Sequence, residues 1–143
     1  MENVKLKVLS IVGVVGGLAG NYLGGWDIAL RTLILFMAVD YTTGLIVAGV
    51  FKSSPKTQTG ALQSKAGFKG LLKKGMVLVM VLIAYRIDML LDSQFIRYGV
   101  IIAYSVNEII SIIENAGLMG LNIPPVLQQG IDLLAKKGER SEK

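Results

Sequence analysis

The sequence predicts an all-α integral membrane protein with about four transmembrane helices in two hairpins and a short amphipathic helix near the C-terminus. Three observations support this fold class. Hydrophobic residues make up 52% of the 143 residues, and charged residues only 17%, against roughly 25% in soluble domains. The apolar residues gather in long uninterrupted segments. The basic residues concentrate outside these segments, as in proteins that follow the positive-inside rule.

The composition also restricts the chemistry. The chain has no cysteine and no histidine, which removes disulfides, thiolates and the commonest general base and metal ligand. It contains neither a Gly-x-Ser-x-Gly elbow nor a Gly-x-x-x-x-Gly-Lys phosphate loop. We therefore expect no enzymatic activity, cofactor or metal. The net charge of +5 would suit a nucleic-acid binder, but the apolar flanks of its basic stretch favour a membrane, so we expect no nucleic-acid partner.

The first apolar segment, 8–24, follows two lysines and is rich in glycine. A basic start before an apolar middle is also typical of a signal peptide. Its glycines recur at spacings that let helix backbones approach closely in lipid: Gly13, Gly16, Gly17, Gly20 and Gly24, with Gly44 in the next segment. We predict a helix-packing face. The alternative is a weakly helical anchor that does not span, which would leave three transmembrane helices.

The second segment, 28–51, is long enough to cross the membrane. A short turn precedes it, in which Trp26 suits the membrane interface. Asp40 lies roughly 18 Å into the segment, at about 1.5 Å per residue. A carboxylate at that depth costs about 2.5–3.5 kcal/mol on insertion scales unless it is paired, protonated or hydrated.

The stretch 52–74 connects the two predicted hairpins and carries no acidic residue. Its cations are six lysines: Lys52, Lys56, Lys65, Lys69, Lys73 and Lys74. A basic loop between apolar segments is expected on the cytoplasmic face. From Gly67 onward the pattern also allows a short amphipathic helix on the membrane surface.

The third and fourth segments, 75–91 and 95–113, complete the second hairpin. The turns that carry Asp27 and Asp92 contain no lysine or arginine, so we expect them on the side opposite the basic loop. This topology places both termini and the loop in the cytoplasm. We divide the chain into a transmembrane domain, 1–135, and a charged, disordered cytoplasmic tail, 136–143.

Polar residues form one helical stripe along the fourth segment, and Asp40 lies at a similar predicted depth. The stripe consists of Arg97, Tyr104, Asn107, Glu108, Ser111, Glu114 and Asn115. Such a stripe cannot face lipid. Two interpretations stay open: hydrogen bonds between helices of one bundle, or the lining of a pore or of a seam between copies.

Several of these motifs, in this order and spacing, resemble the toxin-secretion/phage-lysis holin family over nearly the whole chain. They are Gly24-Gly25-Trp26-Asp27, Asp40 with Thr43-Gly44, then Ser64, Gly67, Lys69-Gly70 and Lys73-Lys74, then Asp88, and finally Asn107-Glu108, Ser111-Ile112, Glu114-Asn115, Gly117, Gly120 and Ile123-Pro124. Accounts of this family often give three spans, and the glycine-rich first segment is the one that departs from that number.

The resemblance implies a phage-type holin. Such a protein accumulates in the bacterial inner membrane and associates with itself among membrane lipids. It then opens lesions that release an endolysin or a toxin, which gives timed lysis of the host cell. Two rival functions remain. One is a small four-helix ion channel or transporter subunit that uses the same carboxylates. The other is an antiholin-like regulator that oligomerises without permeabilising the membrane.

Overall fold

A computed structural model describes residues 1–141, and within this range the chain forms five α-helices and no strand. The helices are α1 (Glu2–Tyr22), α2 (Ile28–Ile46), α3 (Ser64–Leu91), α4 (Phe95–Leu118) and α5 (Pro125–Ser141). A π-helical turn, η1 (Val47–Phe51), extends α2. The prediction of an all-α membrane protein is therefore confirmed.

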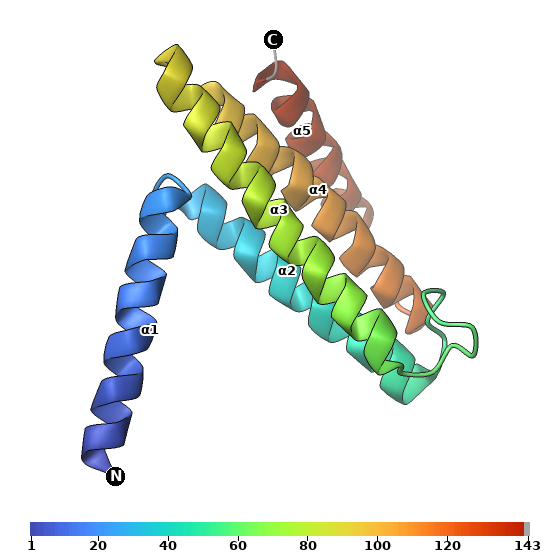
Figure 1. Ribbon diagram of the computed structural model, residues 1–143. Coiled ribbons are helices and arrows are strands. Elements are labelled where there is room, and N and C mark those ends of the chain that lie inside the picture. The colour runs from blue at the N-terminus through green and yellow to red at the C-terminus, as the bar shows by residue number, and fades with distance from the viewer. Residues whose placement is uncertain (142–143) are drawn as a thin grey trace.

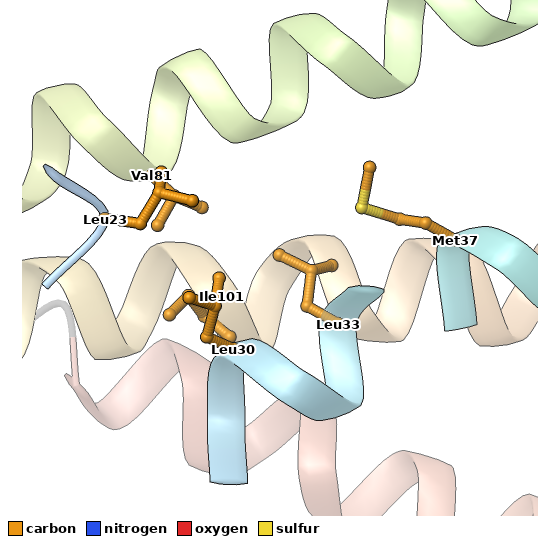
Figure 2. Packing of buried hydrophobic residues seen from close by; sticks show 6 residues of the cluster. All are labelled: Leu23, Leu30, Leu33, Met37, Val81 and Ile101. Carbon is orange, nitrogen blue, oxygen red and sulfur yellow. The ribbon is translucent and has the colours of Figure 1, made fainter. Parts of the chain in front are cut away.

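Helices α2, α3 and α4 lie side by side in an antiparallel bundle, α5 packs along α4, and α1 points away from all of them (Figure 1). We call the end of the bundle with the turns 23–27 and 92–94 the turn end, and the end with the loop 52–63 the loop end. Near the turn end a small apolar core joins the three bundle helices. Figure 2 shows side chains of α2, Val81 of α3 and Ile101 of α4 pointing toward one another.

Three helices within residues 1–141 are long and apolar enough to span a membrane: α1, α2 together with η1, and α4. The predicted span 75–91 is not among them, although α3 lies beside the other two bundle helices. Three charged residues, Lys74, Arg86 and Asp88, fall within the last 18 residues of α3, so its apolar part is more strongly interrupted than a candidate span allows.

The helix boundaries differ from the predictions in several places. Helix α1 begins at Glu2 and so includes the lysines before residue 8. Helix α3 begins at Ser64, and the predicted loop 52–74 is therefore irregular only over 52–63. The expected surface helix after Gly67 is simply the first part of α3, because no proline separates the lysine-rich turns from the apolar ones and the helix continues through Gly75. Helix α4 continues from residue 113 to Leu118.

The C-terminal segment differs most. Pro125 begins α5, as expected for a residue without a backbone N–H in the first helical turn. The helix runs to Ser141, so residues 136–141 are helical and not disordered. Residues 142–143 of the predicted tail lie outside the described residues. Helix α5 also runs back toward the turn end, so its last residues do not share the end of the basic loop as the topology prediction required (Figure 1).

Candidate functional site

A buried ionic cluster joins the three bundle helices. Lys74 of α3 donates from Nζ to Asp40 Oδ2 of α2 at 2.7 Å and to Glu108 Oε2 of α4 at 2.5 Å. The side chains of both carboxylates are 7% exposed, and that of Lys74 is 13% exposed. One ammonium group therefore bridges two carboxylates that would otherwise repel each other.

Asn115, two turns of α4 beyond Glu108, extends the cluster. Its side-chain amide donates to Asp40 Oδ1 at 3.2 Å and to Thr43 Oγ1 at 2.9 Å. The same amide lies 3.3 Å from the backbone oxygen of Asp40. Asp40 thus has partners on both α3 and α4, which satisfies the carboxylate that the sequence placed deep in a span.

A pocket of about 200 Å³ borders the cluster on the α3–α4 side. Tyr104, Asn107 and Ser111 of the predicted stripe line it, together with Lys56 from the loop and Lys73. The charge of Lys56 acts on Asp40 from this side. The pocket therefore combines positive side chains at the loop end with the neutral polar side chains of α4.

The structure thus brings most of the predicted stripe together and separates two of its members. Glu114 is exposed and contacts neither the pocket nor the ion pairs. Arg97 is buried at the turn end, well over a turn of helix from the pocket. Its Nε donates to the backbone oxygen of Leu23, and its guanidinium binds the carboxylate of Asp27 at 2.6 Å.

Arg97 is the center of a second polar cluster, at the turn end. Gly24 adopts a φ of +89°, and a Cβ there would come within 2.5 Å of Arg97 Nε, so both the conformation and the contact require glycine. Asp88 caps α4 by accepting from the backbone N–H of Ile96 and Arg97. The bonds of Arg97 attach the α1–α2 turn to the start of α4, and the bonds of Asp88 attach the end of α3 to it.

Asp27 has a lowered pKa in this cluster. Partial burial raises the pKa of Asp27, but hydrogen bonds from Arg97 and from the N–H of Leu30, with the charge of Arg97, outweigh this effect. The carboxylate also caps the N-terminus of α2 through the Leu30 N–H at 2.9 Å. Asp27 is therefore held in its charged form.

The predicted packing glycines have different surroundings. Gly13, Gly16 and Gly17 have open space where a Cβ would lie. Gly20 contacts the ring of Trp26, whose Nε1 donates to the Gly16 carbonyl at 2.9 Å. Gly44 faces Asn115. A packing role between copies stays a prediction, but the open positions on α1 are accessible to a partner.

Of the six lysines in the predicted basic loop, sequence reasoning misjudged Lys74. Lys52, Lys65, Lys69 and Lys73 are exposed, and Lys56 reaches the pocket. The sequence places Lys74 in the basic loop because it adjoins the other lysines, whereas the structure places it in α3 with both carboxylates as partners. One signal could have identified Lys74: Asp40 and Glu108 lie at similar predicted depths in the membrane, and two carboxylates there require a cation. Lys74 is the last lysine before the apolar run of α3.

The cluster has the features of a structural and electrostatic site. A lysine that bridges two carboxylates favours one arrangement of three helices. Within residues 1–141, no group of three or more Asp, Glu, His or Cys side chains is placed to hold a metal ion. The fold and this site define a class of protein: a small α-helical membrane protein whose bundle is closed by buried ion pairs.

Comparisons with known proteins give the family. The chain belongs to the bacteriophage holin family, which it matches over residues 17–136. It is 27% identical to a protein of Bacillus phage phi105 named a probable holin, over 86% of each chain. It is also 37% identical to an uncharacterised protein of Listeria innocua over 96% of each chain, and to an uncharacterised 14.9 kDa protein of Clostridium perfringens over 96% of this chain and 99% of that one. No solved structure matches the chain.

The family match covers the bundle helices, both polar clusters and most of α5. Membership points to a membrane protein without enzymatic activity, in agreement with the resemblance seen in the sequence.

Proposed function

We propose that this protein acts as a holin in the bacterial cytoplasmic membrane. It accumulates there as separate chains, associates with further copies of itself, and opens lesions through which an endolysin or a toxin leaves the cell. The basic loop end faces the cytoplasm, where anionic lipids attract its lysines. The proposal rests chiefly on the family match over residues 17–136.

Two structural features support self-association. Helix α1 packs against the rest of the chain only near Trp26, and its large apolar residues are exposed along its length. Open glycines on that helix permit another helix to approach closely. A monomer therefore presents a complete apolar helix that can bind a second copy.

The buried ionic cluster gives the bundle a closed state that does not need other copies. Its carboxylates are paired inside one chain, so the isolated bundle can lie in lipid before any lesion forms. If the bundle opens during assembly, Asp40, Lys74 and Glu108 require water or other polar groups as replacements. The cluster can thus delay lesion formation.

The test is controlled expression in a bacterium, with and without an endolysin that lacks a secretion signal. Growth and membrane potential are followed together. We expect a delay, then abrupt depolarisation, and lysis only when the endolysin is present. Depolarisation without enzyme release would indicate a small channel instead. Normal growth and potential at verified membrane levels would favour a regulator that does not permeabilise.

A further inference from the structure

Helix α5 lies beside the part of α4 that belongs to the turn end (Figure 1). Lys137 Nζ is 5.4 Å from the ring centre of Tyr98, in the first turn of α4. Ser141 lines a pocket together with Phe95, Ile96 and Val100. Since α4 is long and apolar enough to span, α5 occupies the same depth as the first half of that span.

One face of α5 is fitted to α4. Ile131 is 5% exposed, and Gly138 is buried seven residues further on, so both lie on the same side of the helix. A Cβ on Gly138 would be 2.9 Å from Ile102 Cγ2, which shows how closely the two helices approach. This contact is specific enough to fix which face of α5 points outward.

The outward face of α5 is mainly polar and charged. Its exposed polar residues are Gln128, Gln129, Asp132, Lys136, Lys137, Glu139 and Arg140, and three apolar residues, Val126, Leu127 and Leu133, are exposed among them. Gln128 Nε2 donates to Asp132 Oδ1 at 3.1 Å on the same exposed side. At the depth of α4, such a face has to be hydrated, because charged groups in contact with hydrocarbon are strongly disfavoured.

We propose that α5 lines the water-filled lumen of the assembled lesion, with its apolar face on α4 and its charged face toward the water. This inference rests on the proposed function and extends it by naming the element that contacts the lumen. Spanning helices α2 and α4 then form the wall behind α5. In this arrangement the charges of α5 need no partner other than water.

The first experiment tests whether α5 stays on α4 after lesions form. The chain has no cysteine, so introduced pairs are the only thiols. Ile102→Cys with Gly138→Cys is oxidised in membranes collected after the onset of leakage, and free thiols are counted by a maleimide mass shift. We expect loss of both thiols. Tyr98→Cys with Lys137→Cys tests the same contact without filling the Gly138 space. Ile102→Cys with Lys136→Cys, which points outward, is the control and should keep its thiols.

The second experiment tests what the outward face contacts. A spin label is placed on Gln129→Cys, or for comparison on Val12→Cys of the exposed apolar helix α1, in lipid vesicles made leaky by the protein. We expect the ratio of relaxation by a water-soluble nickel chelate to relaxation by dioxygen to be at least tenfold higher at residue 129 than at residue 12.

The outcomes separate the two proposals. Failure of both pairs to oxidise, in cells that release endolysin, would overturn the lumen assignment and leave the holin function intact. Oxidised pairs with a label at residue 129 that favours dioxygen would also overturn it, since α5 would then face lipid. Absence of leakage and of endolysin release would instead contradict the proposed function itself.

Discussion

At the residue scale, Lys74 binds carboxylates from two other helices and is one of a run of lysines that otherwise face solvent. Its contribution differs from theirs because of its surroundings. A salt bridge at the surface contributes little, whereas the loss of one partner from a buried pair leaves an uncompensated charge. The same residue type therefore has two roles within a few positions of the chain.

Replacing Lys74 by methionine should destabilise the bundle by about 3–5 kcal/mol, because Asp40 and Glu108 would face each other without a cation. Reversible unfolding in detergent micelles measures this loss. Lys69→Met, at an exposed position of α3 outside the pocket, is the matched control and should change stability by less than about 0.5 kcal/mol. A similar stability for the two variants would contradict the role of Lys74. Adding Asp40→Asn and Glu108→Gln to Lys74→Met should recover part of the loss.

We expect the bond between Asp27 and Arg97 at the turn end to depend on pH. Its pKa in the folded chain lies below the ordinary value of 3.8. The stabilisation from its bond to Arg97 is therefore complete at neutral pH, persists as the pH falls to about 4, and is lost as the pH falls further through the folded pKa. Trp26, the chain's one tryptophan, lies next to this bond and reports it by fluorescence.

The control for this response is Asp27→Asn, which removes the titrating group and leaves nearby Asp88 in place. The variant should show the low-pH fluorescence already at pH 7 and no further transition as the pH falls below about 4. A transition of wild-type size in the variant would assign the response to another carboxylate.

At the scale of elements, α1 differs from the other helices because it has almost no contact with the bundle. It meets α2 through a two-glycine turn that Arg97 binds. The position of α1 therefore depends on a few hydrogen bonds at one end, while its length is free for contacts with other chains. This arrangement is expected for an element that acts between copies.

Gly13→Leu with Gly17→Leu should reduce crosslinked oligomers and delay lysis, because bulk at these positions prevents close helix approach. Within residues 1–141, nothing lies within 4 Å of a Cβ at either position, so the fold should be unchanged. Leucine also favours helix more than glycine does, so a delay would not arise from a weaker helix. Val15→Leu, on the opposite face of α1, is the control. Unchanged timing and oligomer pattern in the glycine variant would rule out this face.

Much of the element structure could be predicted from the sequence. Long apolar runs specified the helices, and the turns around Trp26 and Asp92 separated them correctly. Boundaries were missed where charged residues continue an apolar helix, as before residue 75 in α3. The return of α5 along α4 was not foreseen, because a mixed-charge sequence is usually solvated and nothing local reveals the contact of Gly138 with Ile102.

The candidate site could be predicted only in part. The spacing of Glu108, Ser111 and Asn115 identified one face of α4, and the estimated depths suggested that Asp40 lies near it. The partner Lys74 could not be chosen from a single sequence, since it lies 34 positions after Asp40 and 34 positions before Glu108. Interhelical pairing within one bundle, one of the two interpretations left open, describes what Asp40, Glu108 and Asn115 do in the isolated chain.

At the scale of the whole molecule, the proposed orientation in the membrane rests on the charge of the loops and turns at the two ends of the bundle. The loop end carries exposed lysines of the loop and of the first turns of α3, whereas the turns 23–27 and 92–94 carry no lysine or arginine, although α5 brings Lys136, Lys137 and Arg140 toward the turn end. Before leakage begins, an impermeant thiol reagent added to intact cells should label Gln94→Cys at least tenfold faster than Thr59→Cys. The reverse order would place the loop end outside.

The balance between the closed bundle and the assembled lesion predicts an effect on timing. Glu108→Gln removes one of the two carboxylates bound to Lys74 and weakens the pairing that closes the bundle. Lysis should then begin earlier at equal membrane levels of protein, measured from induction in the presence of the endolysin. Glu114→Gln, the same change at an exposed carboxylate of α4 that contacts neither the pocket nor the ion pairs, is the control. Wild-type timing for Glu108→Gln would show that the cluster does not delay lesion formation.

The position of Lys74 between its two partners in the chain also affects biosynthesis. Asp40 leaves the ribosome first, Lys74 follows 34 residues later, and Glu108 another 34 residues after that. At about 5–20 residues per second, the first carboxylate waits several seconds for its complete set of partners. During that interval Asp40 is unpaired, and helix α2 is poorly suited to enter lipid alone. We expect α2, α3 and α4 to leave the insertion machinery together, as one unit whose release is set by the synthesis of its third helix.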